Sequence, residues 1–81
     1  MNVRVQMFAV AKQLSGQDVV ELDLAPNAVV RDLRRALAAK VPALASWMPH
    51  LMFAINAEYV GDDAPVSPAV EIACIPPVSG G

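Results

Sequence analysis

The most constraining feature of this sequence is a single amphipathic segment in its middle. Apolar residues recur there at steps of three and four, the spacing of one helix face: Val30, Leu33, Leu37, Val41 and Leu44. Basic residues lie largely on the opposite side, where we expect a solvated face or, alternatively, contact with an acidic partner: Arg31, Arg34, Arg35 and Lys40. The pattern predicts one helix over about residues 29–40, with Asn27 as the nearest residue able to cap it. Its single apolar stripe must pack on a sheet.

Sequence on either side of this helix alternates between apolar and polar residues, as strands with one buried face do. We expect strands over five segments: 3–8, 20–24, 52–55, 58–60 and 70–75. Residues 9–14 are expected to form a short helical or turn segment, and residues 42–50 a connection. This order predicts an α+β fold in the β-grasp arrangement, a mixed sheet of four or five strands covered by one main helix. The first and last strands can then lie side by side in the middle.

Composition limits the classes of protein to which the chain can belong. Its 81 residues suffice for one domain, and 56% hydrophobic residues exclude a disordered chain. Eight acidic and six basic residues give a net charge of −2, which argues against nucleic-acid binding. No apolar run approaches the roughly 20 residues that span a bilayer, and no signal-peptide pattern opens the sequence, so a cytoplasmic location without membrane contact is expected. One cysteine and one histidine cannot build a four-ligand zinc site.

The end of the sequence carries its most informative motif: Pro76, Pro77, Val78, Ser79, Gly80 and Gly81. The two prolines hold the segment extended, and the two glycines have no Cβ, so they can pass through a channel only as wide as the backbone. We therefore divide the chain into a β-grasp domain, residues 1–75, and an extended, flexible Gly-Gly tail, residues 76–81. The alternative is a frayed end, since chain ends often finish in small residues.

Such a tail has the shape of a substrate rather than of a catalytic site. The terminal carboxylate of Gly81 is unhindered, but a carboxylate is a poor acyl donor, so another enzyme must activate it by attack on the α-phosphate of ATP. Sulfur can open the resulting acyl-adenylate to give a thiocarboxylate, whereas a thiol or an amine would give a conjugate. The tail residues by themselves favour neither outcome.

The sequence resembles the small, sulfur-carrying subunit of molybdopterin synthase, a MoaD-type family of ubiquitin-like β-grasp proteins, over nearly its whole length. Four segments carry the resemblance, and the tail is the most specific of them: Phe8-Ala9, Val30-Arg31-Asp32-Leu33-Arg34, Ala54-Ile55-Asn56 and Pro76-Pro77-Val78-Ser79-Gly80-Gly81. The resemblance implies that an E1-like adenylyltransferase (MoeB-type) uses ATP to adenylate Gly81. A sulfur donor such as a cysteine desulfurase or a rhodanese would then convert Gly81 to a thiocarboxylate.

The resemblance also implies a partner and a place in a reaction. The tail residues from Pro76 to Gly80 would enter the large subunit of molybdopterin synthase (MoaE-type), and the sulfur on Gly81 would pass to cyclic pyranopterin monophosphate. The chain would be the sulfur-donating subunit of a heterotetrameric synthase in molybdenum cofactor biosynthesis. It would be catalytically inert on its own, with no bound cofactor and no metal.

Three apolar side chains are candidates for the contact with that partner: Phe8, Tyr59 and Ile75. The strand phases place them on the sheet face away from the helix, and the resemblance matches them to the family's contact with the large subunit. The alternative is that they are scattered surface residues, which are common in monomeric proteins.

Other conspicuous residues are given structural interpretations. Cys74 is expected to be a small core residue, because no base or cation is spaced to lower the pKa of its thiol. His50 is expected in a solvated loop, since nothing pairs with it as an acid–base couple. Trp47 and Met48 are expected to cover the open end of the core, with a role in docking as the alternative.

Three other functions stay open from the residues. The chain could carry sulfur for thiamine or cysteine synthesis, although thiamine carriers are usually shorter and lack the Pro-Pro pair. It could be a ubiquitin-like modifier, in which Gly81 would form an isopeptide bond to a lysine. It could also be a plain binding module with an incidental Gly-Gly end.

Overall fold

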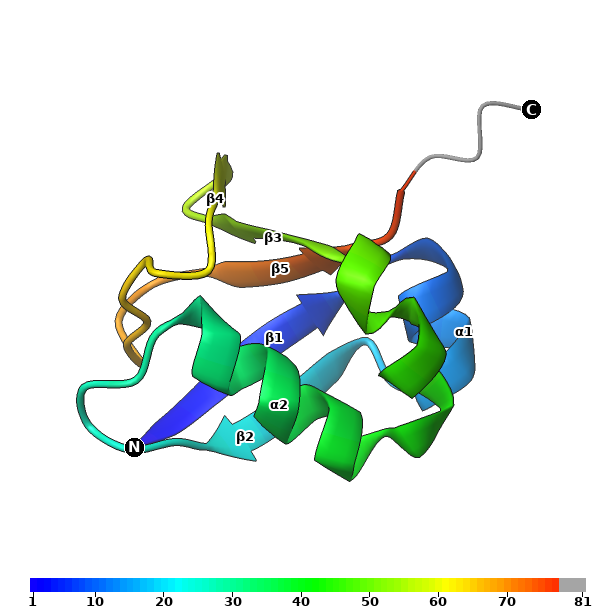
Figure 1. Ribbon diagram of the computed structural model, residues 1–81, viewed down its shortest axis with the longest axis horizontal. Helices are drawn as coiled ribbons and strands as arrows, with labels where there is room; N and C mark the ends of the chain where they lie inside the picture. The colour runs from blue at the N-terminus through cyan, green and yellow to red at the C-terminus, as the bar shows by residue number, and fades with distance from the viewer. Residues whose placement is uncertain (78–81) are drawn as a thin grey trace.

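One mixed sheet of five strands carries the fold, and the longer α-helix lies across it (Figure 1). The computed structural model describes residues 1–77. In chain order the elements are β1 (Asn2–Met7), α1 (Ala9–Ser15), β2 (Val19–Asp23), α2 (Val30–Lys40), the 3₁₀ helix η1 (Pro42–His50), β3 (Met52–Ile55), β4 (Glu58–Val60) and β5 (Ile72–Ile75). The order of strands across the sheet is β2-β1-β5-β3-β4. The predicted α+β, β-grasp fold is confirmed.

The first and last strands lie side by side, as expected. β1 and β5 run parallel, with Val5 opposite Ile72 and Met7 opposite Cys74. The other neighbouring strands are antiparallel: β1 with β2, β3 with β5 and β3 with β4. β5 is therefore the central strand, and it ends at the same end of the sheet as β1, near α1 (Figure 1).

The core lies between the sheet and α2. Alternate residues of β1 and the predicted stripe of α2 meet there in one buried cluster: Val3, Val5, Met7, Val30, Leu33 and Leu37. Phe53 from β3 and Cys74 from β5 are fully buried in the same cluster. Full burial of a Val, Leu or Phe side chain contributes about 1.5–3 kcal/mol, so the stripe of α2 is a main source of stability.

Most elements lie within one residue of the prediction, and three differences have a clear structural cause. β1 ends at Met7, because α1 begins two residues later, and so Phe8 lies outside the strand. β5 begins at Ile72, since the Val70 amide instead donates to the carbonyl of Ser67 at 3.5 Å in a turn. Residues 42–50, expected as a connection, form η1, which begins with a proline at a position whose N–H needs no partner.

The start of α2 corrects the expected cap. The N-cap residue is Val29 rather than Asn27, and the carboxylate of Asp32 accepts the Val29 amide at 2.9 Å. The next two amides of the helix donate to backbone carbonyls of the turn after β4: Val30 to Ala64 and Arg31 to Asp62, both at 2.9 Å. A distant segment thus satisfies the amides that Asn27 was expected to serve.

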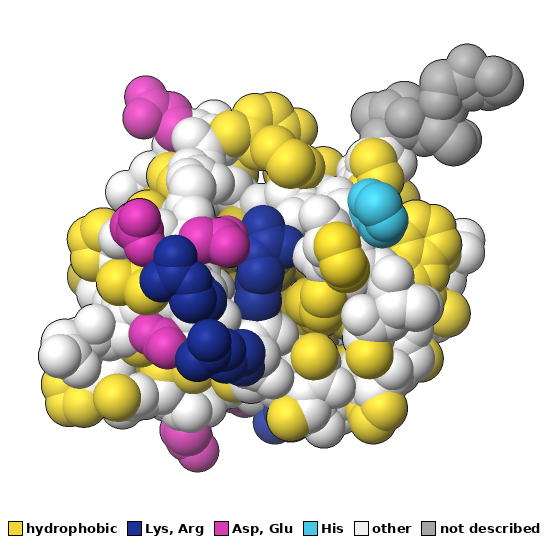
Figure 2. Space-filling model, viewed as in Figure 1, with side chains coloured by type: hydrophobic (Ala, Val, Ile, Leu, Met, Phe, Trp, Pro, Cys, Tyr) yellow, Lys and Arg dark blue, Asp and Glu magenta, His cyan; other side chains and the backbone are white. Residues whose placement is uncertain are grey.

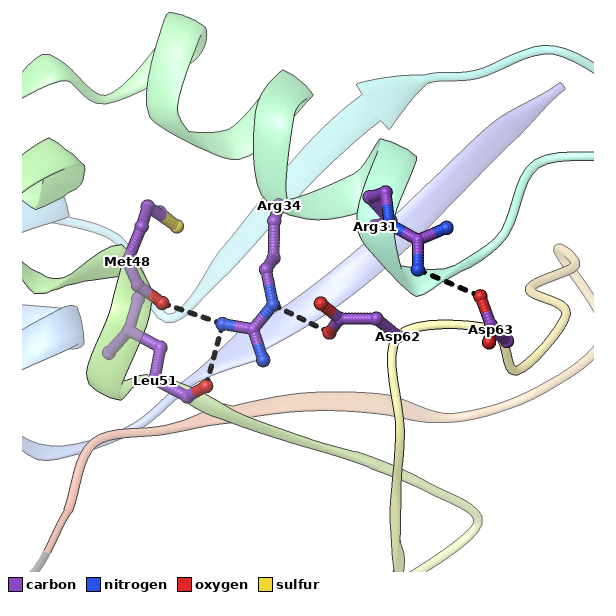
Figure 3. A network of polar contacts seen from close by, with 6 residues as sticks. All are labelled: Arg31, Arg34, Met48, Leu51, Asp62 and Asp63. Carbon is purple, nitrogen blue, oxygen red and sulfur yellow. Dashed lines mark hydrogen bonds and ion pairs between the residues drawn. The ribbon is translucent and has the colours of Figure 1, made fainter.

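The prediction that Arg34 of α2 lies on a solvated face is wrong, because its side chain is partly buried, with 22% exposure. Its guanidinium donates to the Asp62 carboxylate at 2.8 Å and to the carbonyls of Met48 and Leu51 at 2.6 and 2.8 Å (Figure 3). Its Cζ lies 4.9 Å from the centre of the Phe53 ring, a cation–π distance. One side chain thereby joins α2 to η1, to the start of β3 and to the turn after β4.

The other two arginines of the predicted solvated face, Arg31 and Arg35, are exposed, as expected. Arg31 pairs with Asp63 at 2.8 Å (Figure 3), and this hydrogen bond raises the pKa of the guanidinium. The pair lies in solvent, where such pairs contribute little to stability. The three arginines that look equivalent on a helical wheel therefore have different roles.

We predict that Arg34→Met lowers the free energy of unfolding by about 2–3 kcal/mol, because two carbonyls and a carboxylate lose their shared donor. The matched control is Arg35→Met, an exposed position on the same helix, which should change it by less than about 0.5 kcal/mol. Urea unfolding followed by circular dichroism measures both. Equal effects of the two substitutions would contradict the structural role of Arg34.

Candidate functional site

The face of the sheet opposite α2 has no helix on it among the described residues, and it is the candidate functional surface. The register places Gln6 of β1 beside Ala73 of β5, Ala73 beside Ala54 of β3, and Ala54 beside Tyr59 of β4. The two central residues of this row are alanines, whose short side chains leave the middle of the face low. The larger side chains stand around them.

The result is a hollow of about 350 Å³ on this open face. It brings together all three residues that were predicted to contact a partner, among nine lining residues: Gln6, Phe8, Ala54, Ala57, Tyr59, Glu71, Ile72, Ala73 and Ile75. Phe8 is 45% exposed and Tyr59 is 64% exposed, which is unusual for aromatic side chains of a small protein. The structure therefore places the predicted residues on one surface, while their role in binding stays a prediction.

Met52 is a residue of this surface that the sequence analysis missed. It pairs with Ile75 across β3 and β5 and is 44% exposed. The strand phase carried the signal, because Met52 is two residues from Ala54 and so lies on the same face. We call Phe8, Met52, Tyr59 and Ile75 the open-face patch.

Two backbone segments hold the patch residues in place. Phe8 stands between β1 and α1, where its amide donates to the carbonyl of Cys74 at 3.3 Å. On the other side, the turn between β3 and β4 is tied to the residue before β5. The Asn56 amide donates to the Glu71 carbonyl at 2.9 Å, and the Glu71 amide donates to the Asn56 side-chain oxygen at 3.0 Å. Hydrogen bonds thus fix Phe8 and the turn between β3 and β4 to the chain of β5 and the residue before it.

The predicted tail begins at the end of the central strand. β5 ends at Ile75, a residue of the open-face patch; Pro76 is buried and Pro77 is exposed. The remaining tail residues that we singled out, Val78, Ser79, Gly80 and Gly81, lie outside the described residues. Ile75, a residue of the patch, is therefore followed directly by the first two residues of the predicted tail.

Charged side chains gather over α2 and the turn after β4. Figure 2 shows basic and acidic side chains side by side over α2 and the turn after β4, whereas the surface beside them over η1 is largely hydrophobic or uncharged. Glu71 is the one Asp, Glu, Lys, Arg or His residue among those that line the hollow on the open face. Beyond the hollow, the open face also carries charged side chains, because Arg4 of β1 lies opposite Glu21 of β2 there.

Cys74, Trp47 and Met48 have the structural roles predicted for them, whereas the expectation for His50 is met only in part. Cys74 is fully buried, and burial raises the pKa of its thiol to about 11, although the charge of Arg34 opposes this. Trp47 and Met48 are half-buried against the core, as expected of residues that cover its open end. His50 is exposed, but at the end of η1 rather than in a loop.

Residues 1–77 lack two further features. No group of three or more His, Cys, Asp or Glu side chains in this part of the chain is arranged to hold a metal ion. None of the helices described there is long and apolar enough to cross a lipid bilayer.

A five-stranded mixed sheet, one long helix on one face, and the last strand at the centre define a ubiquitin-like β-grasp protein. The chain belongs to the ThiS family, whose model matches residues 5–81. It is 36% identical to the molybdopterin synthase sulfur carrier subunit of Chlamydomonas reinhardtii over 83 aligned positions that cover 100% of both chains.

Solved structures agree with this assignment. SAMP1 from Haloferax volcanii, a small archaeal modifier protein, matches with a TM-score of 0.86 and 27% identity over 100% of both chains. A putative molybdopterin converting factor subunit 1 from Pyrococcus furiosus matches with a TM-score of 0.84 and 27% identity, over 96% of this chain and 99% of that one.

The buried thiol makes stability depend on pH in the alkaline range. Its pKa is 9.0 in the unfolded chain and about 11 in the folded protein. The unfolded state therefore loses this proton first, and the contribution to stability is fully present below pH 9 and falls as the pH rises toward 11. We predict that the free energy of unfolding of the wild type falls relative to that of Cys74→Ala by about 1 kcal/mol between pH 9 and 10. Parallel profiles in urea unfolding would contradict the burial of the thiol.

Proposed function

We propose that this chain is the sulfur carrier subunit of molybdopterin synthase and that it works through the terminal carboxyl group of Gly81. The observation that carries the proposal is the position of the open-face patch at the end of the strand that leads into the Gly-Gly tail. The full-length similarity to a molybdopterin synthase sulfur carrier subunit supports the same function. The proposal makes the chain a substrate and a subunit, with no catalytic group of its own.

The chemistry follows from the reactivity of a carboxylate. A carboxylate oxygen of Gly81 attacks the α-phosphorus of ATP on an E1-like adenylyltransferase, and the bond to pyrophosphate breaks. The terminal sulfur of a persulfide on a donor such as a cysteine desulfurase or a rhodanese then attacks the acyl carbon, AMP leaves, and an acyl disulfide forms. A second thiol reduces its S–S bond, forms a disulfide with the donor cysteine, and releases the acyl sulfur. The product is a thiocarboxylate, which donates its sulfur to cyclic pyranopterin monophosphate in the large subunit.

The tail residues suit this use. Pro76 and Pro77 have no amide proton, so the sheet cannot extend its hydrogen bonds through them. Gly80 and Gly81 have no side chains that would obstruct a narrow channel. We propose that residues 76–80 occupy such a channel in each partner while the open-face patch contacts the partner's surface.

The patch is tested by Phe8→Ser, which removes an exposed aromatic side chain. We expect the affinity for the molybdopterin synthase large subunit to fall about tenfold or more, because aromatic anchors dominate binding energy at interfaces. Leu14→Ser is the matched control, since Leu14 is an apolar residue of α1 with 38% exposure that does not line the hollow. Isothermal titration calorimetry should show less than a twofold change for it. Equal losses for both variants would contradict a specific patch.

The sulfur chemistry is tested by top-down mass spectrometry of the protein purified from its own host. We expect replacement of one oxygen by sulfur, localised by fragmentation to Gly81. Fragmentation is required because oxidation of any of the four methionines gives nearly the same mass change. Deleting Gly81 should end sulfur transfer in the reconstituted synthase and leave thermal unfolding unchanged. A Gly81-deleted chain that still supports formation of the dithiolene would overturn the proposal.

A second candidate, a ubiquitin-like modifier, has one observation in its favour: the similarity to the small archaeal modifier protein. In that function an amine would open the acyl-adenylate, and Gly81 would be found in an isopeptide bond to a lysine. The same mass spectra distinguish the two functions. A carrier for thiamine or cysteine synthesis would also carry the thiocarboxylate, but it would form no dithiolene with the large subunit.

A further inference from the structure

Strained backbone occurs at the hollow of the open face. Three residues other than glycine have positive φ in the described chain: Ala9 at 51°, Asn56 at 50° and Ala57 at 69°. The left-handed region is tolerated by asparagine but is unfavourable for alanine, because the Cβ crowds the following carbonyl. Ala57 is therefore the strained residue of the turn between β3 and β4.

This turn has the geometry of a two-residue hairpin. Asn56 and Ala57 connect paired strands, with Ile55 opposite Glu58, and both have positive φ. Turns of this type favour asparagine followed by glycine, since glycine adopts the second conformation without strain. The chain has asparagine at the first position and alanine at the second, so a side chain is present where stability alone favours none.

The position of Ala57 at the hollow suggests a role for its side chain. Ala57 lines the hollow together with Tyr59, while the double hydrogen bond between Asn56 and Glu71 fixes the turn to the start of β5. A glycine at residue 57 would remove a wall of the hollow. It would also let the turn adopt other conformations, which would release the short strand that carries Tyr59.

We propose that Ala57 is a positioning residue for partner binding: its methyl group walls the hollow and restricts the turn that presents Tyr59, at the expense of stability. The inference rests on the proposed function, in which the large subunit of molybdopterin synthase covers this face. According to the inference, the methyl group of Ala57 lowers the stability of the fold and strengthens binding to the large subunit. A residue with a purely structural role would not affect stability and binding in opposite directions.

Ala57→Gly tests the inference. We expect its Tm to rise by about 2–5 °C through relief of the left-handed strain. We expect its Kd for the large subunit to become roughly three- to tenfold weaker, the change that corresponds to one methyl group lost from an interface. Ala57→Ser keeps the Cβ and should bind within twofold of the wild type.

Gly16→Ala is the matched control. Gly16 also has φ of 69°, at the end of α1, and a Cβ there would have no atom within 4 Å. It does not line the hollow. This variant should therefore lower the Tm without changing the Kd, which shows that strain by itself does not alter binding.

The outcomes separate the inference from the proposed function. A large subunit that does not bind the wild type overturns the proposed function. Binding of the wild type with an unchanged Kd for Ala57→Gly overturns the inference alone, and so does a lower Tm for that variant. A weaker Kd for Gly16→Ala would also overturn it, since the loss would then follow stability rather than the wall of the hollow.

Discussion

The position of β5 is the constraint on which the rest of the structure depends. The last strand of the sequence fills the middle of the sheet, between the parallel β1 and the antiparallel β3. The sheet cannot be completed until this strand is in place, so the fold rests on contacts between distant parts of the chain. The same arrangement makes the described chain leave the domain from the central strand, which is hydrogen-bonded to a neighbour on each side.

The two faces of the sheet are built for different purposes. On one face, α2 covers the core, and Arg34 joins it to η1, to the start of β3 and to the turn after β4. The other face has alanines at its centre and large apolar side chains around them. The edges are less available for association, because β4 has three residues and the Lys40 ammonium donates to the Glu21 carbonyl of β2 at 2.8 Å. Of the four large apolar side chains that are exposed in the described residues, the open-face patch contains three: Phe8, Met52 and Tyr59.

Sequence periodicity predicted the features that depend on residues close together in the chain. It failed for features that depend on contacts with distant residues. The stripe of α2 and the alternation of β1 follow from local spacing, and both are confirmed. The cap of α2 was wrong because the carbonyls that accept its first amides come from residues 62 and 64. The prediction that the Arg34 side chain is solvated was wrong for the same reason, since nothing in the helical pattern distinguishes Arg34 from Arg35. The hollow could be predicted only in part, because its depth depends on the register that places Ala54 beside Ala73.

The short side chains of the open face and the strained turn beside it both help to give the hollow a fixed shape. A domain that offers its own end to another protein must be held at a fixed distance from that protein, or the end will not reach the reacting atoms. A flat apolar face would bind but would allow sliding, whereas a hollow walled by Phe8, Ala57 and Tyr59 can hold a complementary surface in one register. Ile75 lies both in that hollow and at the last position of β5, so under the proposed function a partner that docks at the face would contact the strand from which the tail begins.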